Sequence, residues 1–172
     1  MEEKILYKGS LGVDYTQFYI DNHNDDDLLP EEAFEKQENG LCGASQKGKL
    51  FFVPGLHDGY IDITVTLFNQ EPEIDDSFDE IVEVSLEISE PTMLCEWAHE
   101  ETHDLDLPNG VYRVRYSLTC MDDEHNEDTN YELPLLSQKH AIQIWPCPLA
   151  QDKTLKTISS TASYWHSEWG KA

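Results

Sequence analysis

The stretch that decides the fold is YRVRYSLTC at residues 112–120, in which apolar and polar side chains alternate one by one. A period of two places every second side chain on the same side of an extended chain, so that one side can face a core. The same alternation recurs in IDITVTL at residues 61–67 and in VEVSLEI at residues 82–88. These three stretches are predicted to be β-strands with one buried face and one polar, solvated face.

Further strands are predicted on either side of these three. Short runs rich in β-branched and aromatic residues at 13–20, 49–53 and 141–145 have the composition of strands. Turn-forming residues separate the predicted strands, at 54–55, 58–59, 69–72 and 108–110. Many short strands punctuated by turns predict an all-β fold, specifically an antiparallel β-sandwich of the jelly-roll kind.

One short helix and a distinct C-terminal tail complete the predicted organisation. The helix should begin at Pro30, which suits the first helical position, and end at Asn39-Gly40. The tail, residues 149–172, has three lysines against two acids and carries the large aromatics Tyr164, Trp165 and Trp169. The length of 172 residues suits one domain. We therefore expect a sandwich at 1–148 with the tail packing on it, although a tail that orders only on a partner is the alternative.

The charge of the chain is strongly negative and uneven. Asp and Glu number 35 against 11 Lys and Arg, which gives a formal net charge of −24. Residues 50–112 contain 16 acids and no Lys or Arg. Such a chain repels nucleic acids and anionic membranes, so neither is an expected partner. There is no apolar run long enough to span a membrane and no signal-peptide pattern, so we expect a cytoplasmic protein.

Two interpretations of the excess charge are open: solubility in a generally acidic proteome, or an electrostatic docking face for a basic protein. We favour the docking face, because ordinary soluble surfaces mix both signs of charge. Trp97 is the predicted apolar anchor of this face, with an ordinary core tryptophan as the alternative. The predicted acidic rim consists of Asp75, Asp76, Asp79, Glu80, Glu83, Glu100, Glu101, Asp104, Asp122, Asp123 and Glu124.

Two arginines and one tryptophan receive structural predictions. Arg113 and Arg115 lie on the polar face of the 112–120 strand, where we expect them to pair with neighbouring carboxylates. Trp145 ends a predicted strand just before Pro146, and it should seal the core there. The four cysteines are far apart in the sequence, so we expect reduced thiols.

Residues 99–103, HEETH, fit the H-E-x-x-H pattern of zinc hydrolases. On a helix, His99 and His103 would lie one turn apart on one face and bind the metal, with Glu100 as general base. Extra acids inside this segment and at its end argue against a buried catalytic helix, because their desolvation is costly. The third ligand would have to come from Glu124 or Glu127, in a polar segment after a strand. A zinc-dependent hydrolase therefore stays an alternative.

Calcium binding is the second alternative. Residues 21–32 have the length of an EF-hand loop with an acid at each end, but Asp26 stands where the turn requires glycine and His23 occupies the third position. The EF-hand is rejected on these grounds. A ligand-binding β-sandwich with calcium at an acidic cluster stays open, while the preferred interpretation requires no cofactor and no catalytic residue.

Three pieces of the chain carry a resemblance to a known group of proteins: Tyr15-Thr16-Gln17-Phe18, Leu107 to Arg115, and Ile142-Gln143-Ile144-Trp145-Pro146. Their order and spacing resemble the acidic bacterial β-sandwich proteins of the competence protein J type, over residues 11–146. That resemblance implies a protein-binding role as inhibitor of a nuclease. Together with the charge, it leads us to expect a non-enzymatic inhibitor or immunity protein that binds a basic nuclease or toxin.

Overall fold

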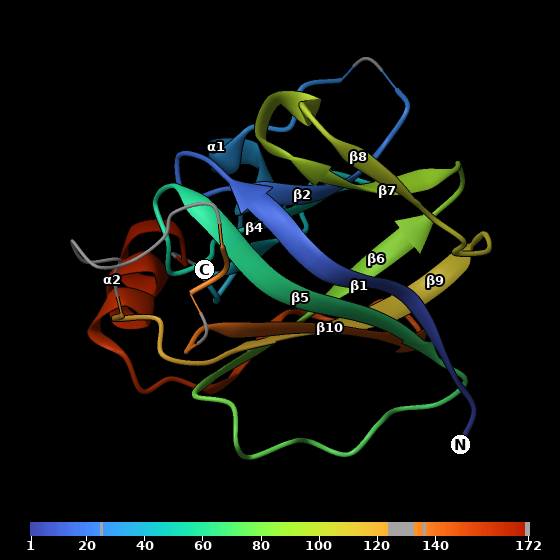
Figure 1. The fold of residues 1–172 in the computed structure, drawn as a ribbon. Helices are drawn as coiled ribbons and strands as arrows, with labels where there is room; N and C mark the ends of the chain where they lie inside the picture. Colours follow the sequence, from blue (N-terminus) through green and yellow to red (C-terminus); the bar gives the residue numbers. More distant parts are fainter. Residues whose placement is uncertain (25, 124–132, 136, 171–172) are drawn as a thin grey trace.

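The computed structural model describes residues 1–24, 26–123, 133–135 and 137–170, and the fold is built mostly from strands (Figure 1). Its helical elements, within those residues, are α1 (Pro30–Ala33), α2 (Ser160–Trp169) and the 3₁₀ turn η1 (Trp97–His99). The strands are, in chain order, β1 (Glu3–Val13), β2 (Phe18–Asn22), β3 (Cys42–Gly43), β4 (Leu50–Phe52), β5 (Gly59–Phe68), β6 (Glu80–Ile88), β7 (Thr92–Glu96), β8 (Thr102–Leu105), β9 (Gly110–Leu118), β10 (Lys139–Pro146) and β11 (Lys153–Lys156). The predicted all-β class is confirmed.

The strands form two sheets, in the orders β1-β5-β10-β9-β6-β11 and β3-β4-β2-β7-β8. The expectation of purely antiparallel sheets is wrong at one pair, because β10 runs parallel to β5. The connection at residues 69–79 crosses the bottom of the view in Figure 1 and returns the chain to the end of the sheet at which β5 starts. Strand β6 begins there and so runs in the same direction as β5. A long crossover of this kind lets two strands of one sheet point the same way.

The inner faces of both sheets enclose one apolar core. As the alternation predicts, Val82, Val84 and Leu86 on β6 and Val114 on β9 are buried. Each such side chain contributes roughly 1.5–3 kcal/mol when it leaves water. At the centre, the ring of Phe18 stacks on Phe52 with 4.7 Å between centroids, so β2 and β4 are held by aromatic as well as aliphatic packing.

Several predicted boundaries are corrected by the structure. The predicted strand at 13–20 is two strands, because residues 14–17 form a tight turn between β1 and β2. Helix α1 ends at Ala33 rather than at Asn39-Gly40. Strands β1, β7 and β8 escaped prediction because their sequences do not alternate cleanly between apolar and polar residues.

The C-terminal segment is fixed to the rest of the fold at several points. Strand β11 pairs with β6, and Trp169 of α2 stacks on Phe34 with 5.8 Å between centroids. The imidazole Nδ1 of His166 accepts the backbone N–H of Gly40 at 2.8 Å. A Cβ on Gly40 would overlap the backbone of α2 at Trp165, so the helix lies against this loop as closely as the chain allows.

Candidate functional site

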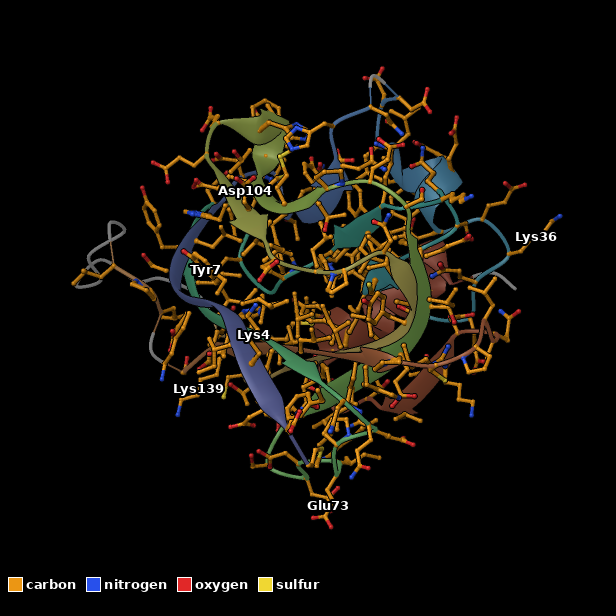
Figure 2. The ribbon with its side chains drawn as sticks, turned by 90° about the vertical axis from the view of Figure 1, so that its right-hand side faces the viewer. Lys4, Tyr7, Lys36, Glu73, Asp104 and Lys139 are labelled. Atoms are coloured by element: carbon orange, nitrogen blue, oxygen red, sulfur yellow. The ribbon has the colours of Figure 1, made fainter. Side chains whose placement is uncertain are left out.

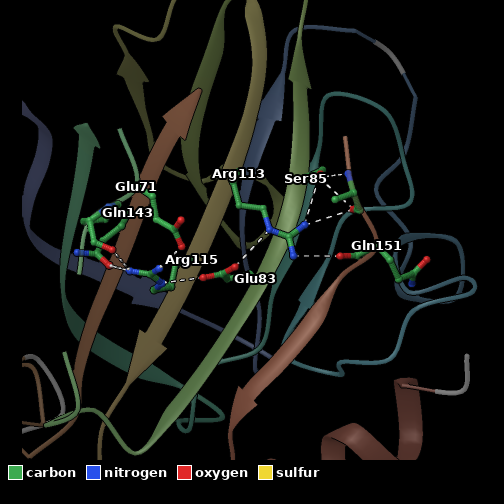
Figure 3. Close-up of polar contacts among 9 residues, drawn as sticks. Glu71, Glu83, Ser85, Arg113, Arg115, Gln143 and Gln151 are labelled. Carbon is green, nitrogen blue, oxygen red and sulfur yellow. Dashed lines mark hydrogen bonds and ion pairs between the residues drawn. The ribbon is translucent and has the colours of Figure 1, made fainter. Parts of the chain in front are cut away.

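The outer face of the large sheet carries buried charge rather than a solvated polar surface (Figure 3). Arg115 donates from Nε to Glu83 at 2.9 Å, and Arg113 donates from Nε to the other Glu83 oxygen at 3.4 Å. The predicted pairing of both arginines with carboxylates is therefore confirmed. The expected solvated face is wrong for β9, because Arg113 and Arg115 are only 4% and 1% exposed.

Two loops cover these arginines and are hydrogen-bonded to them. Arg115 donates to the backbone carbonyl of Pro72 at 2.9 Å, and Arg113 donates to that of Gln151 at 3.0 Å. The Arg115 guanidinium also lies 4.9 Å over the ring of Trp145. Trp145 is buried under this arginine on the outer side of the sheet, whereas its neighbour Ile144 belongs to the core. The expectation that Trp145 seals the core is therefore wrong.

Two of the predicted rim carboxylates are structural and cannot meet a partner. Glu83 is 6% exposed and is shared by both arginines. Glu80 is fully buried, and its Oε1 accepts the backbone N–H groups of Ile158 and Ser159, at 2.6 and 3.1 Å. Both were predicted as docking residues from their place in an acid-rich strand, and burial shows those predictions to be wrong.

The remaining rim residues form two groups at different ends of the molecule. Glu100, Glu101 and Asp104 belong to the β7–β8 hairpin at the top of Figure 1, and Asp75, Asp76 and Asp79 belong to the connection or strand start at the bottom. Figure 2 likewise labels Asp104 near the top of the view and Glu73, from the same connection, at the bottom. The predicted acids therefore do not form one continuous face.

Most of the rim acids outside the β7–β8 hairpin, which include Asp122 and Asp123 after β9, are engaged in backbone hydrogen bonds. Asp79 accepts the N–H of Cys120 at 2.8 Å, and Asp122 accepts the N–H of Thr161 at 2.8 Å at the start of α2. Asp75 accepts the N–H of Ser77 at 2.9 Å. The hydroxyls of Ser77 and Thr161, followed by these backbone N–H groups, lower the pKa of the Asp75 and Asp122 carboxyls. Asp76 and Asp123 are exposed, and Glu124 lies outside the described residues.

The acids of the β7–β8 hairpin lie next to two tight turns, which are neighbours in the fold. Residues 14–17 join β1 to β2, and residues 97–100 join β7 to β8, each with two central residues at positive φ. Those residues are Tyr15 and Thr16 in one turn, and Ala98 and His99 in the other, at φ between 54° and 57°. Hairpin turns of this shape normally use glycine or asparagine, so each turn stores backbone strain. Strain of this kind persists at positions that the surrounding fold holds in place.

An aromatic pair joins the two turns. The ring centroids of Tyr15 and Trp97 lie 4.8 Å apart at an interplanar angle of 53°. Tyr15 is 57% exposed, whereas Trp97 is half-buried and packs against the core. Trp97 therefore lies at the edge of the core and also contacts an exposed tyrosine, and its role as an anchor stays a prediction.

Carboxylates surround this pair and repel one another. Burial, followed by the charges of Asp58 and Glu100, raises the pKa of Asp14. Burial, followed by the charge of Glu101, raises the pKa of Glu96. Asp58 lies beside the same pair: its Oδ1 accepts the Tyr15 N–H at 3.3 Å, and its Oδ2 lies 2.6 Å from Nδ1 of His57. We call this set the hairpin surface; it consists of Asp14, Tyr15, Asp58, Glu96, Trp97, Glu100 and Glu101.

Four members of the hairpin surface were missed from the sequence: Asp14, Tyr15, Asp58 and Glu96. They come from three separate loops or strand ends, and only folding brings them together. One available signal was Tyr15-Thr16-Gln17-Phe18, which carried the resemblance but was interpreted as part of a strand.

The helical premise of the zinc alternative is wrong. His99 lies at the end of η1, whereas His103 lies on β8, so the two imidazoles are not stacked on one helical face. The Nε2 atom of His99 lies 2.9 Å from Asp21, while His103 packs on Tyr7 with 4.6 Å between ring centroids. The His99 contact instead fixes the hairpin to a buried Asp21–Lys49 ion pair of 2.6 Å.

Metal-binding geometry is likewise missing from the described part of the chain. Within those residues, no three His, Cys, Asp or Glu side chains are placed to hold one metal ion. The former EF-hand candidate contributes Asp26, Asp27 and Glu32 to an open cavity of about 530 Å³. Asp21, the first residue of that candidate, is buried and bound to Lys49. In the same part of the chain, no helix is long and apolar enough to cross a membrane.

Comparison with known proteins finds likeness in fold rather than in sequence. No protein-family profile and no curated protein sequence matches the chain. Two solved structures do, each at 16% identity over 86% of this chain and 100% of their own. They are ComJ from Bacillus subtilis, described as inhibitor of the DNA-degrading activity of NucA, with a TM-score of 0.58, and a protein described as "Crocagin biosynthetic gene J", with a TM-score of 0.52. The predicted resemblance to the competence protein J type is confirmed as a shared fold.

Proposed function

We propose that this chain is an inhibitor that binds a basic nuclease or toxin through the hairpin surface. The observation that carries the proposal is an exposed aromatic pair held on two strained turns and surrounded by carboxylates, of which Asp14 and Glu96 have a pKa raised by burial and by neighbouring negative charge. The known activity of ComJ, which has the same fold, supports a nuclease as the partner class. The role requires no catalytic residue and no cofactor.

The electrostatics of the hairpin surface favour a cationic partner. Among the described residues, no lysine or arginine forms an ion pair with Asp14, Glu96, Glu100 or Glu101. A nuclease has a positively charged cleft because it must hold phosphates. Contact between these surfaces relieves the repulsion among the carboxylates, and long-range attraction speeds the encounter at low salt.

The aromatic pair supplies packing contacts for affinity, which the exposed charges do not provide. Exposed acids steer a partner and set its orientation, but affinity comes mainly from a few well-packed residues near the centre of an interface. Tyr15 and Trp97 hold this central position, with acids on several sides. Because both turns are hydrogen-bonded to the fold, little conformational entropy is lost on binding.

The test compares two double variants that change the net charge equally. Glu100→Gln/Glu101→Gln removes two of the five acids of the hairpin surface, and Glu73→Gln/Asp76→Asn removes two exposed acids at the other end. Each protein is immobilised and used to deplete DNA-degrading activity from extracts of the source organism, at about 0.05 M and 0.5 M salt. Degradation of plasmid DNA by the depleted extract is then measured.

We expect the wild type and the Glu73→Gln/Asp76→Asn control to remove DNA-degrading activity at low salt, and the hairpin variant to remove much less. High salt should weaken removal, because it screens exposed charges. Equal removal by the two variants would place the binding surface elsewhere. No removal by the wild type at either salt concentration would contradict the nuclease-inhibitor role.

A further inference from the structure

We infer that the Tyr15–Trp97 pair binds an arginine side chain of the partner in preference to a lysine. This inference rests on the proposed function and specifies the chemistry of the partner's binding surface. The face of an aromatic ring attracts cations, and nearby carboxylates add their own Coulomb attraction for the same cation. Here the two rings lie 4.8 Å apart and Tyr15 is 57% exposed, so a partner side chain can reach them.

The carboxylates favour the shape of a guanidinium. Asp14 and Glu100 lie close enough for their charges to act on each other, and Asp58 is hydrogen-bonded to the backbone of Tyr15. A planar guanidinium stacks on a ring while its N–H groups donate outward, in the plane, to carboxylates. An ammonium group is compact and strongly hydrated, so it satisfies the ring and the carboxylates together less well.

The molecule already contains this arrangement once, inside its own fold. Arg115 lies 4.9 Å over Trp145 and donates to the Glu83 and Glu71 carboxylates, at 2.9 and 3.3 Å. The hairpin surface repeats the aromatic ring and the carboxylates but has no arginine of its own among the described residues. His57 lies beside this surface, with its Nδ1 2.6 Å from an Asp58 oxygen, but its ring meets Tyr15 edge-on and does not stack on it. The stacked arginine is the group that a basic partner supplies.

The rest of the molecule provides a matched aromatic control. Tyr164 and Trp165 on α2 have ring centroids 4.9 Å apart, and Tyr164 is 55% exposed. The helix that carries this second pair contributes a single acid, Glu168. An aromatic pair with similar exposure and few acids should therefore show little preference for arginine.

The experiment titrates the whole chain with two short peptides of equal charge, one with three arginines and one with three lysines, otherwise glycine and serine. Binding is followed by NMR from the indole N–H signals of the four tryptophans, with Trp97 assigned from the Trp97→Phe variant. We expect the arginine peptide to bind roughly three- to ten-fold more tightly and to shift the Trp97 signal most.

Three substitutions make the result specific. Tyr15→Leu should remove the arginine preference, Tyr15→Phe should keep it, and Tyr164→Leu should leave it unchanged. Equal affinity for both peptides, or a preference that survives Tyr15→Leu in a folded protein, would overturn the inference. Equal affinity that still depends on Glu100 and Glu101 would leave the proposed function standing, whereas failure of the nuclease-depletion test would remove the proposed function itself.

Discussion

The two Tyr–Trp pairs of this molecule are alike in ring separation and in the exposure of their tyrosines, and they differ in interplanar angle and in what surrounds them. Tyr15 and Trp97 are 82 positions apart in the sequence and meet on two strained turns among carboxylates. Tyr164 and Trp165 are neighbours on α2, whose ends are fixed by hydrogen bonds to Asp122 and Gly40. Exposed aromatic area is thus common to both regions, and the charge around it distinguishes the proposed docking surface from the helix α2, which packs on the rest of the fold.

The largest expected difference between α2 and the hairpin surface is the loss of stability caused by a glycine-to-alanine substitution next to each. In Gly40→Ala the new Cβ would overlap the Trp165 carbonyl oxygen, which belongs to the backbone and cannot move without shifting α2. In Gly12→Ala the new Cβ would overlap a Glu96 carboxylate oxygen at the end of a flexible side chain. We expect Gly40→Ala to lower the free energy of unfolding by about 3 kcal/mol, and Gly12→Ala to lower it by less than about 1 kcal/mol.

Urea denaturation of both variants measures this difference. A loss of similar size in both would mean that the hairpin surface is as rigidly packed as α2, and that Glu96 cannot turn aside. A negligible loss in Gly40→Ala would mean that α2 is not held against the 38–40 loop.

Lowering the pH should destabilise the region around α2 and stabilise the hairpin surface. Burial lowers the pKa of His166 on α2, and it lowers the pKa of the fully buried His140 to about 3; His140 lies on β10 and belongs to neither region. An unfolded histidine takes up its proton near pH 6.5, so folding stability is lost as the pH falls from 6.5 toward the folded pKa. For His140 this amounts to about 2 kcal/mol between pH 6.5 and pH 5.

The raised pKa values of Asp14 and Glu96 give the opposite dependence. A carboxyl whose folded pKa is raised favours the folded state at low pH, and this advantage is lost as the pH rises through that pKa. Hydrogen exchange at pH 7 and pH 5 should therefore show α2 opening more readily at the lower pH, relative to the hairpin surface. His166→Asn keeps an acceptor for the Gly40 N–H without a titrating ring, and it should reduce the effect on α2. An identical change in both regions would contradict this account.

The smallest expected effect is a gain in stability at the hairpin surface. Asp14→Asn removes one of the mutually repelling carboxylates, and we expect the free energy of unfolding at pH 7 to rise by about 0.5 kcal/mol or less, because solvent screens the charges. The same substitution should weaken binding of the basic partner. Asp76→Asn, at the other end, serves as the control and should change neither quantity measurably. A stability loss in Asp14→Asn would show that this carboxylate is structural.

Regular alternation made much of the large sheet predictable from sequence. The inward-facing residues of β5, β6 and β9 follow from the period of two, since Ile61, Val84 and Val114 point to the same core. The outer face was not predictable in this way. Nothing local to Glu83 indicates that two arginines from β9 and two covering loops bury it, because those partners come from distant parts of the chain.

The candidate site was predictable only in part, for the same reason. Trp97, Glu100 and Glu101 were found because they lie in one acid-rich stretch. Asp14 and Asp58 were missed because they are single acids beside a turn, without a local pattern. Turn chemistry was misleading too: Tyr15-Thr16 and Ala98-His99 contain no glycine or asparagine, so neither hairpin turn was recognised.

The most direct test of the docking account is a hydrogen-exchange footprint of the whole chain, free and bound to the nuclease that it depletes from extracts. We expect new protection at residues 14–17 and 96–101, and no change at α2. Protection that falls on α2 and β11 instead, with both hairpin turns unchanged, would contradict the account.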